Sequence, residues 1–175
     1  FPRPRERGWG WGFDGQDKMD DRVQAMKNCG TLTFMNKLSR YSLLVGALLL
    51  VGGAFFYYPK WQQPNTEATI SWDVAGYYLY LPAVFIYGDL KQLSFGEKML
   101  DRYHSAPELS AFPHPGGSRV IKYSCGQALQ FLPWFLLAHA SAEALGYPAD
   151  GFSYPYQFAI SMGSLLVALL GLWFL

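Results

Sequence analysis

Apolar positions gather into three long runs, separated by stretches rich in polar and turn-forming residues. The first run covers residues 41–58 (YSLLVGALLLVGGAFFYY) and contains no charged residue. At about 1.5 Å per residue, a helix of this length measures about 27 Å, close to the hydrocarbon thickness of a bilayer. The pattern predicts a transmembrane helix over residues 35–58 and further transmembrane helices over residues 124–145 and 156–175.

The residues that flank the first run predict its orientation. Lys37 and Arg40 precede it, while Tyr57, Tyr58 and Trp61 follow it as an aromatic belt at the membrane interface. The positive-inside rule then places the N-terminus in the cytoplasm. A cleaved signal peptide is the alternative, but the run is long for its apolar region and no small-x-small cleavage site follows it.

The region between the first two runs, residues 59–123, is too polar for lipid and is expected to be an extracytoplasmic loop with juxtamembrane helices. Ser71 stands where it would cap a short helix that begins at the next residue. Pro82 is expected to kink or end that helix. A second helical piece is expected over residues 95–103, and the Pro/Gly-rich stretch 106–118 reads as a loop.

The link over residues 146–155 is expected to be cytoplasmic, with the third helix going out again. Its one charged residue is Asp150, so the positive-inside rule gives no support to the later spans. The expected fold class is therefore all-α, a polytopic membrane protein with about three transmembrane helices.

The two ends of the sequence differ from the middle. Residues 1–34 are charged and glycine-rich without an apolar period, so they are expected to be disordered or a spurious extension before Met35. The third apolar run reaches Leu175 without a polar anchor behind it, so the chain is interpreted as a fragment.

Composition narrows the function classes. Aromatic residues make up 18% of the chain, charged residues only 15%, and the formal net charge is +1. A balanced charge gives no indication of nucleic acid as a partner. Cys29 and Cys125 form neither metal-ligand spacing nor a disulfide framework, and the expected topology puts them on opposite sides of a membrane.

Asp73 is the first candidate for chemistry. In a helix, Asp73, Tyr77 and Tyr80 lie at i, i+4 and i+7, which places them on one face. An acid beside aromatic rings just outside the bilayer could bind a sugar, orient a hydroxyl or act as a general base. The alternative is that Asp73 only complements the positive end of the helix dipole.

Two cations come next, directly before the second run. Arg119 and Lys122 at the outer membrane surface suit a phosphate or pyrophosphate group. The alternative is snorkelling, in which long basic side chains anchor a helix end. His104 and His114 lie in the same region without the spacing of a zinc site, so no metal ligands are assigned.

The order of these features resembles a known family. WDVAGYYLYLPAVFIYGDL (residues 72–90), KYSCGQALQFLPWFLLAH (122–139) and GYPADGFSYPYQ (146–157) resemble, over residues 36–175, the N-terminal part of GT-C glycosyltransferases. These are multi-span enzymes that use polyprenyl-phosphate sugars, similar to families 39 and 83, and include bacterial membrane proteins. Two features depart from the family pattern: Asp73 lacks an adjacent Glu, and no Pro-Pro pair follows Lys122.

The resemblance implies a reaction and roles. Asp73 would position or deprotonate the acceptor hydroxyl, Tyr77 and Tyr80 would bind substrate, and Lys122 with Arg119 would hold the lipid-linked phosphate as it leaves. A divalent cation bridging Asp73 and the phosphate is compatible with this chemistry, but the sequence requires no cofactor. The acceptor is unspecified.

The resemblance also implies a bacterial cytoplasmic (inner) membrane and an enzyme that is inactive as this fragment alone. Two other classes are weighed against it: a non-catalytic membrane scaffold or assembly protein, and a transporter subunit for a lipid-linked substrate. The few polar residues of the third run count against the transporter.

Overall fold

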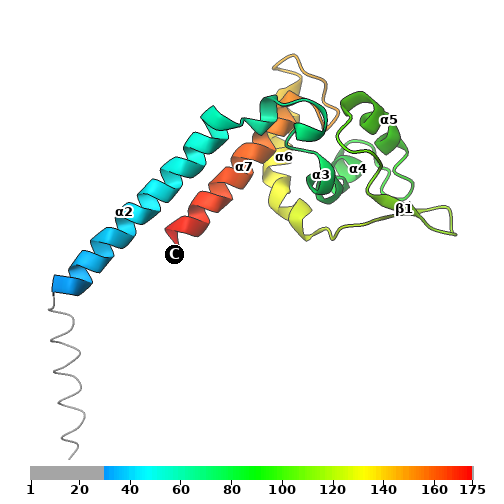
Figure 1. Cartoon of the computed structure of the whole chain (residues 1–175). Helices are drawn as coiled ribbons and strands as arrows, with labels where there is room; N and C mark the ends of the chain where they lie inside the picture. The colour runs from blue at the N-terminus through cyan, green and yellow to red at the C-terminus, as the bar shows by residue number, and fades with distance from the viewer. Residues whose placement is uncertain (1–29, 175) are drawn as a thin grey trace, which may run out of the picture. The chain divides into compact units, whose positions relative to one another are not determined.

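The computed structural model describes residues 30–174, with side chains from residue 39 onward. The chain divides into two units, Phe1–Val45 and Gly46–Leu175. Residues 1–34 were predicted to be disordered or a spurious extension. Residues 1–29 of this segment lie outside the described residues, and from Gly30 the chain is helical. The described residues are mostly helical (Figure 1), which agrees with the expected predominance of helices.

The first apolar run forms helix α2 (Gly30–Gly52), which continues into the π-helical turn η1 (Gly53–Tyr57). The π turn is closed by the N–H of Tyr58, which donates to the carbonyl of Gly53 at 3.0 Å. Large apolar side chains are exposed along it, among them Leu48 and Leu49 at 71% each. Ser39–Gln62 is one of two helical stretches in the described part of the chain that are long and apolar enough to cross a membrane.

Short helical elements follow: η2 (Lys60–Gln62), η3 (Asn65–Glu67), α3 (Trp72–Tyr78), α4 (Tyr80–Phe85) and α5 (Ser94–Tyr103). The helices predicted after Ser71 and over residues 95–103 are confirmed. Ser71 precedes α3 as expected, but its hydroxyl donates to the carbonyl of Ala68 at 2.7 Å instead of capping the helix. Helix α3 is separated from α4 at Leu79, three residues before Pro82, which cannot donate to the preceding turn.

The stretch that was expected to be a loop forms part of a small sheet. Strands β1 (Ala111–Pro113) and β2 (Arg119–Ile121) pair antiparallel, with Phe112 opposite Val120. The turn between them uses Gly117 at φ +73° and a hydrogen bond from the N–H of His114 to the carbonyl of Ser118 at 2.8 Å. This hairpin corrects the all-α expectation, because the Pro/Gly-rich turn here reverses the chain into a ladder.

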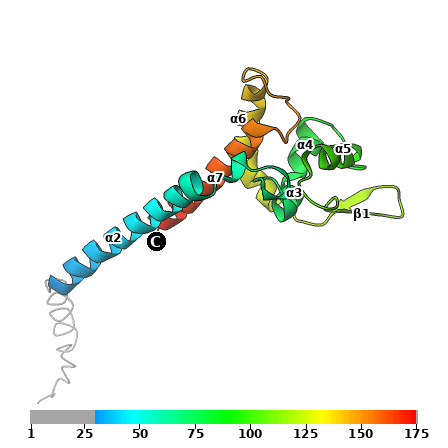
Figure 2. The same cartoon turned by 45° about the horizontal axis from the view of Figure 1, so that its top comes forward.

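The second and third apolar runs form α6 (Gly126–Ala142) and α7 (Tyr154–Trp173). Helix α6 has 17 residues with Pro133 inside it, whereas α7 has 20 and is the second candidate membrane span of the described residues. The two helices lie side by side (Figure 1, Figure 2), joined by a 2.6 Å hydrogen bond between His139 Nδ1 and the Tyr156 hydroxyl. Of the three expected spans, two thus meet the length and composition needed to cross a membrane.

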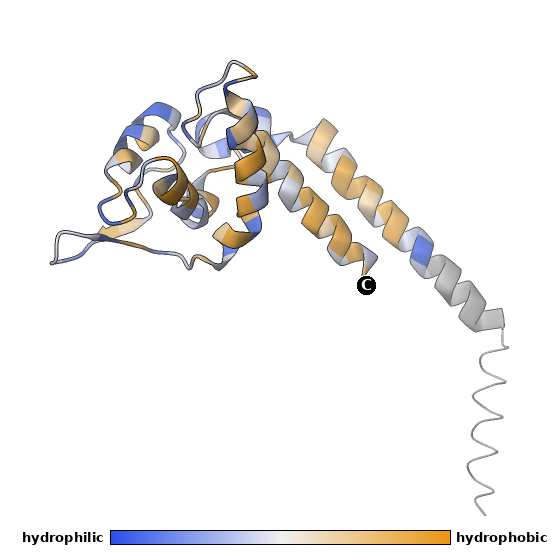
Figure 3. Cartoon of the chain, turned by 180° about the vertical axis from the view of Figure 1, so that it is seen from behind, coloured by the Kyte–Doolittle hydropathy of each residue, from blue (hydrophilic) through white to orange (hydrophobic). Residues whose placement is uncertain are grey.

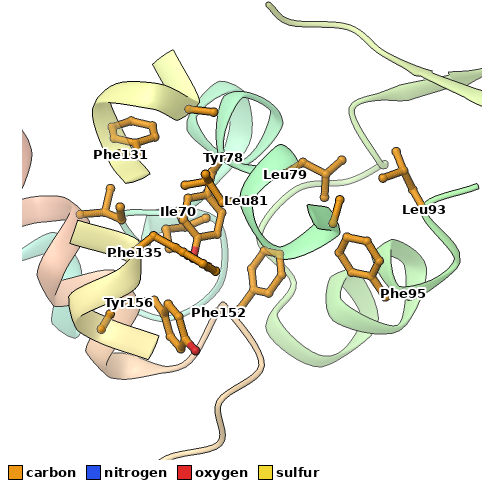
Figure 4. Close-up of a cluster of buried hydrophobic side chains, with 14 of the residues drawn as sticks. Ile70, Tyr78, Leu79, Leu81, Leu93, Phe95, Phe131, Phe135, Phe152 and Tyr156 are labelled. Carbon is orange, nitrogen blue, oxygen red and sulfur yellow. The ribbon is translucent and has the colours of Figure 1, made fainter. Parts of the chain in front are cut away.

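A core of aromatic rings connects α3, α6, α7 and the link between the last two helices (Figure 4). The Tyr78 ring lies 5.9 Å from the Phe135 ring and 5.7 Å from the Phe152 ring, measured between centroids. Phe135 also lies 5.6 Å from Tyr156. Tyr78, Phe135 and Tyr156 are fully buried, so α6 packs as a core helix along this side.

The link between α6 and α7 is hydrogen-bonded to the region that precedes α6. Three tyrosine hydroxyls donate to it: Tyr78 to the Gly151 carbonyl at 2.5 Å, Tyr87 to the Asp150 carbonyl at 3.0 Å, and Tyr103 to Asp150 Oδ2 at 2.5 Å. A bilayer about 30 Å thick cannot separate groups in hydrogen-bond contact. These contacts do not fit the expected topology, in which residues 59–123 and the link 146–155 face opposite sides of a membrane.

Candidate functional site

Four of the five candidate site residues meet at Tyr123. The Tyr123 hydroxyl donates to Asp73 Oδ1, and the Tyr77 ring lies against the Tyr123 ring at 4.5 Å between centroids and an angle of 40°. The Tyr80 hydroxyl donates to the Tyr123 carbonyl at 2.7 Å, and Lys122 Nζ lies 5.3 Å from the centre of the Tyr123 ring. We call these five residues the Tyr123 cluster.

Helix geometry explains why α3 presents this face. Asp73 and Tyr77 are one helical turn apart, and Gly76 between them leaves room for the ring of Tyr123. A Cβ at position 76 would overlap two carbons of that ring and press on Ser110 Cβ, which would lie 2.9 Å away. The close approach of Tyr123 to α3 therefore requires glycine at this position.

Trp72, directly before Asp73, has a left-handed backbone with φ +48°. This conformation costs a residue with a Cβ about 1–2 kcal/mol. It allows the Trp72 N–H to donate to the Ser105 carbonyl at 3.0 Å, which ties the start of α3 to the loop after α5. Such strained residues gather at functional sites.

The electrostatics of the cluster centre on the phenol. The Asp73 carboxylate accepts the hydroxyl hydrogen of Tyr123 and thereby raises the pKa of that phenol, while the neighbouring Lys122 ammonium acts in the opposite direction. Asp73 and Lys122 are both exposed to solvent. The cluster thus combines an accessible carboxylate, a phenol that orients it and an accessible cation, a set that can orient a hydroxyl and hold an anion.

Arg119 is placed elsewhere. Its guanidinium pairs with Glu97 of α5, and its backbone N–H donates to the Lys91 carbonyl at 2.8 Å. The ion pair already compensates the charge of Arg119 and holds β2 against α5. The structure therefore does not bring Arg119 into the Tyr123 cluster with Lys122.

Sequence reasoning missed two residues. Tyr123 was not singled out, although it directly follows the candidate Lys122. Asp150, read as the lone charge of a link, accepts N–H groups of Phe152 at 2.9 Å and Ser153 at 3.0 Å and pairs with Arg102 at 3.3 Å. The sequence signal for Asp150 is a lone acid in a turn flanked by proline and glycine, where its carboxylate can accept backbone N–H groups.

Metal ligands are not clustered in the described part of the chain. Residues 30–174 hold no group of three or more His, Cys, Asp or Glu side chains that could bind an ion. The Tyr123 cluster itself offers one carboxylate and phenol oxygens.

Comparison of the chain with protein-family models, with curated proteins and with solved structures gave no match.

Proposed function

We propose that the chain is part of an integral membrane glycosyltransferase that moves a sugar from a polyprenyl-phosphate donor to an acceptor on the extracytoplasmic face. In this proposal Ser39–Gln62 and Tyr154–Trp173 cross the bacterial inner membrane, and the N-terminus is cytoplasmic. The residues between these spans form one body on the outer face.

One observation carries the proposal. Asp73, Tyr77, Tyr80 and Lys122 are the residues to which the family resemblance gives roles, and they come from segments about fifty positions apart. They meet around a single residue, Tyr123: Asp73, Tyr77 and Lys122 at its side chain and Tyr80 at its backbone carbonyl. A set of residues that merely capped a helix and anchored a second one would not need a common partner.

The cluster suits a displacement at the anomeric carbon of the donor. The acceptor oxygen forms a bond to that carbon while the carbon–oxygen bond to phosphate breaks, and the bonding pair leaves on the phosphate oxygen. Asp73 takes the acceptor proton and Lys122 stabilises the departing phosphate. Tyr123 positions the carboxylate, because its hydroxyl holds one carboxylate oxygen and leaves the other free.

A non-catalytic membrane scaffold is the second candidate. The observation that favours it is the same hydrogen bond, since the contact between Asp73 and Tyr123 also fastens α3 to the segment just before α6. In that case Asp73 serves packing and has no substrate.

The test compares variants of the natural full-length protein in membranes, assayed for transfer from polyprenyl-phosphate sugars. We expect Asp73→Asn to lower transfer about 100-fold or more, because it removes the base while keeping the shape. Asp101→Asn is the matched control, an exposed acid on α5 outside the cluster, and should leave transfer unchanged. Equal transfer by wild type and Asp73→Asn would remove Asp73 from the mechanism and favour the scaffold.

A further inference from the structure

A second candidate site lies between the two helical stretches that are long enough to cross a membrane. A groove of about 290 Å³ is lined by Ala54, Tyr58 and Lys60 of the first stretch and by Ile160, Ser161 and Ser164 of the second. Val74 of α3 and Phe131 of α6 close it on the side of the body. All of these residues belong to the unit Gly46–Leu175.

The polar side of this groove is cationic. Lys60 is the one charged residue in its lining, and it is exposed. The ion pairs of the described residues, Arg102 with Asp150 and Arg119 with Glu97, do not involve Lys60. The nearest carboxylate in sequence, Glu67, accepts the Tyr58 hydroxyl at 2.6 Å and does not line the groove.

Hydroxyl groups also line the groove. Thr69 Oγ1 and Ser161 Oγ are hydrogen-bonded to each other at 2.6 Å, and Ser164 lies one turn further along α7. In the Thr69–Ser161 pair one hydroxyl hydrogen is used between the two, so one donor stays available for a ligand. A lysine with neighbouring hydroxyl donors is suited to a phosphate group.

The rest of the lining is mainly apolar and includes Ala54, Phe131 and Ile160. After Ser164, the exposed side chains of Leu166 and Val167 on α7 are apolar as well. Figure 3 shows hydrophobic residues around the last turns of α7. A ligand that satisfies both sides is an amphiphile with an anionic head and a hydrocarbon tail.

We propose that this groove binds the phosphate of a membrane lipid, with Lys60 as its counter-ion and the tail lying along the apolar side. Lys60 differs in this from Arg119, whose charge is compensated by Glu97. The inference rests on the proposed function in one respect, that the chain lies in a membrane. It does not require sugar transfer.

The experiment measures binding of polyprenyl monophosphate to the full chain in a neutral maltoside detergent, by native mass spectrometry over a lipid titration. Lys60→Gln should weaken binding about tenfold, because a charge-assisted hydrogen bond is lost. The control Lys98→Gln removes an exposed lysine of α5, far in sequence from the groove, and should bind as wild type does. Equal affinity of Lys60→Gln and wild type would overturn the proposal.

A steric pair tests the groove without changing charge. Ser164→Leu fills it from α7, whereas Ala168→Leu adds the same bulk one turn later at an exposed position outside the lining. We expect only Ser164→Leu to weaken binding. Equal loss in both variants, or in neither, would contradict a site in this groove.

Two further ligands identify the chemistry. An anionic phospholipid that binds as well as polyprenyl monophosphate, with the same dependence on Lys60, indicates a general lipid-phosphate site and supports the proposal. Inorganic phosphate that binds as tightly as either lipid would overturn the role of the tail. Asp73→Asn should keep full lipid binding, so loss of transfer and loss of lipid binding are separate results.

Discussion

Helices α6 and α7 arise from apolar runs that look alike in sequence, yet their surroundings differ. Helix α6 is buried at intervals along its whole length, from Ala128 to Ala142. The buried residues of α7 all lie between Pro155 and Gly163, and its last turns are exposed and apolar. An apolar run therefore predicts a helix whose side chains are shielded from water, while the neighbouring elements determine whether protein or lipid surrounds them.

The largest expected effect tests burial at the core of α6. Phe135→Ala should lower the free energy of unfolding by about 3–5 kcal/mol, because Phe135 is fully buried among aromatic rings. Phe174→Ala, at the exposed end of α7, should stay within about 0.5 kcal/mol of wild type. Chemical denaturation of the detergent-solubilised chain measures the free energy of unfolding of both variants. Equal losses of stability would contradict the difference in burial between α6 and the end of α7.

A charge on each helix tests which one meets lipid. Leu166→Arg in α7 should raise the free energy of membrane insertion by about 2.5 kcal/mol. Leu137→Arg, on the exposed side of α6, should cost less than about 1 kcal/mol if water covers that side. Insertion assays on microsomal membranes compare the two variants. Equal penalties would mean that α6 also lies in lipid.

The crossing of α6 and α7 can be tested at one glycine. A Cβ at Gly163 would overlap the indole of Trp134, so Gly163→Ala should destabilise the chain by about 1–3 kcal/mol. Gly171→Ala meets nothing within 4 Å and should be neutral or slightly stabilising. Thermal unfolding in detergent separates them, and a neutral Gly163→Ala would place the two helices further apart than the structure does.

The smallest expected effect concerns the link. Burial and the hydrogen bond to Asp150 raise the pKa of Tyr103 in the folded state. The neutral phenol therefore stabilises the fold fully below the unfolded-state pKa of about 10. This stabilisation is lost as the pH rises through the higher folded-state pKa. Tyr103→Phe should cost about 1 kcal/mol at neutral pH and weaken this alkaline loss. Tyr147→Phe is the control. An unchanged alkaline profile in Tyr103→Phe would show that the link is not held by this bond.

Local patterns predicted much of the fold. Helices are present after Ser71, over residues 95–103 and in the three apolar runs, as the local patterns predicted, although Ser71 does not cap α3. The hairpin was missed because its strands have three residues each and one contains Pro113, so neither shows a strand period.

The candidate site was predicted only in part, because local patterns indicate which residues share a helix face but not which distant residues they contact. Asp73, Tyr77 and Tyr80 share a helix face, which spacing alone indicates. The meeting of that face with Tyr123, the pairing of Arg119 with Glu97 and the contacts of Asp150 with Tyr87 and Tyr103 join residues between 22 and 63 positions apart. No local pattern encodes such pairings. They determine that Lys122, and not Arg119, joins the Tyr123 cluster, and that the link between α6 and α7 contacts the region that precedes α6.

The most direct measurement asks whether α6 separates two faces of a membrane. Single-cysteine chains carrying either Cys125, which is exposed just before α6, or Tyr147→Cys, just after it, are labelled with a membrane-impermeant maleimide in sealed vesicles. The hydrogen bonds from Tyr78, Tyr87 and Tyr103 to the link predict that both cysteines react from the same face. Labelling from opposite faces would contradict the single body between the two spans.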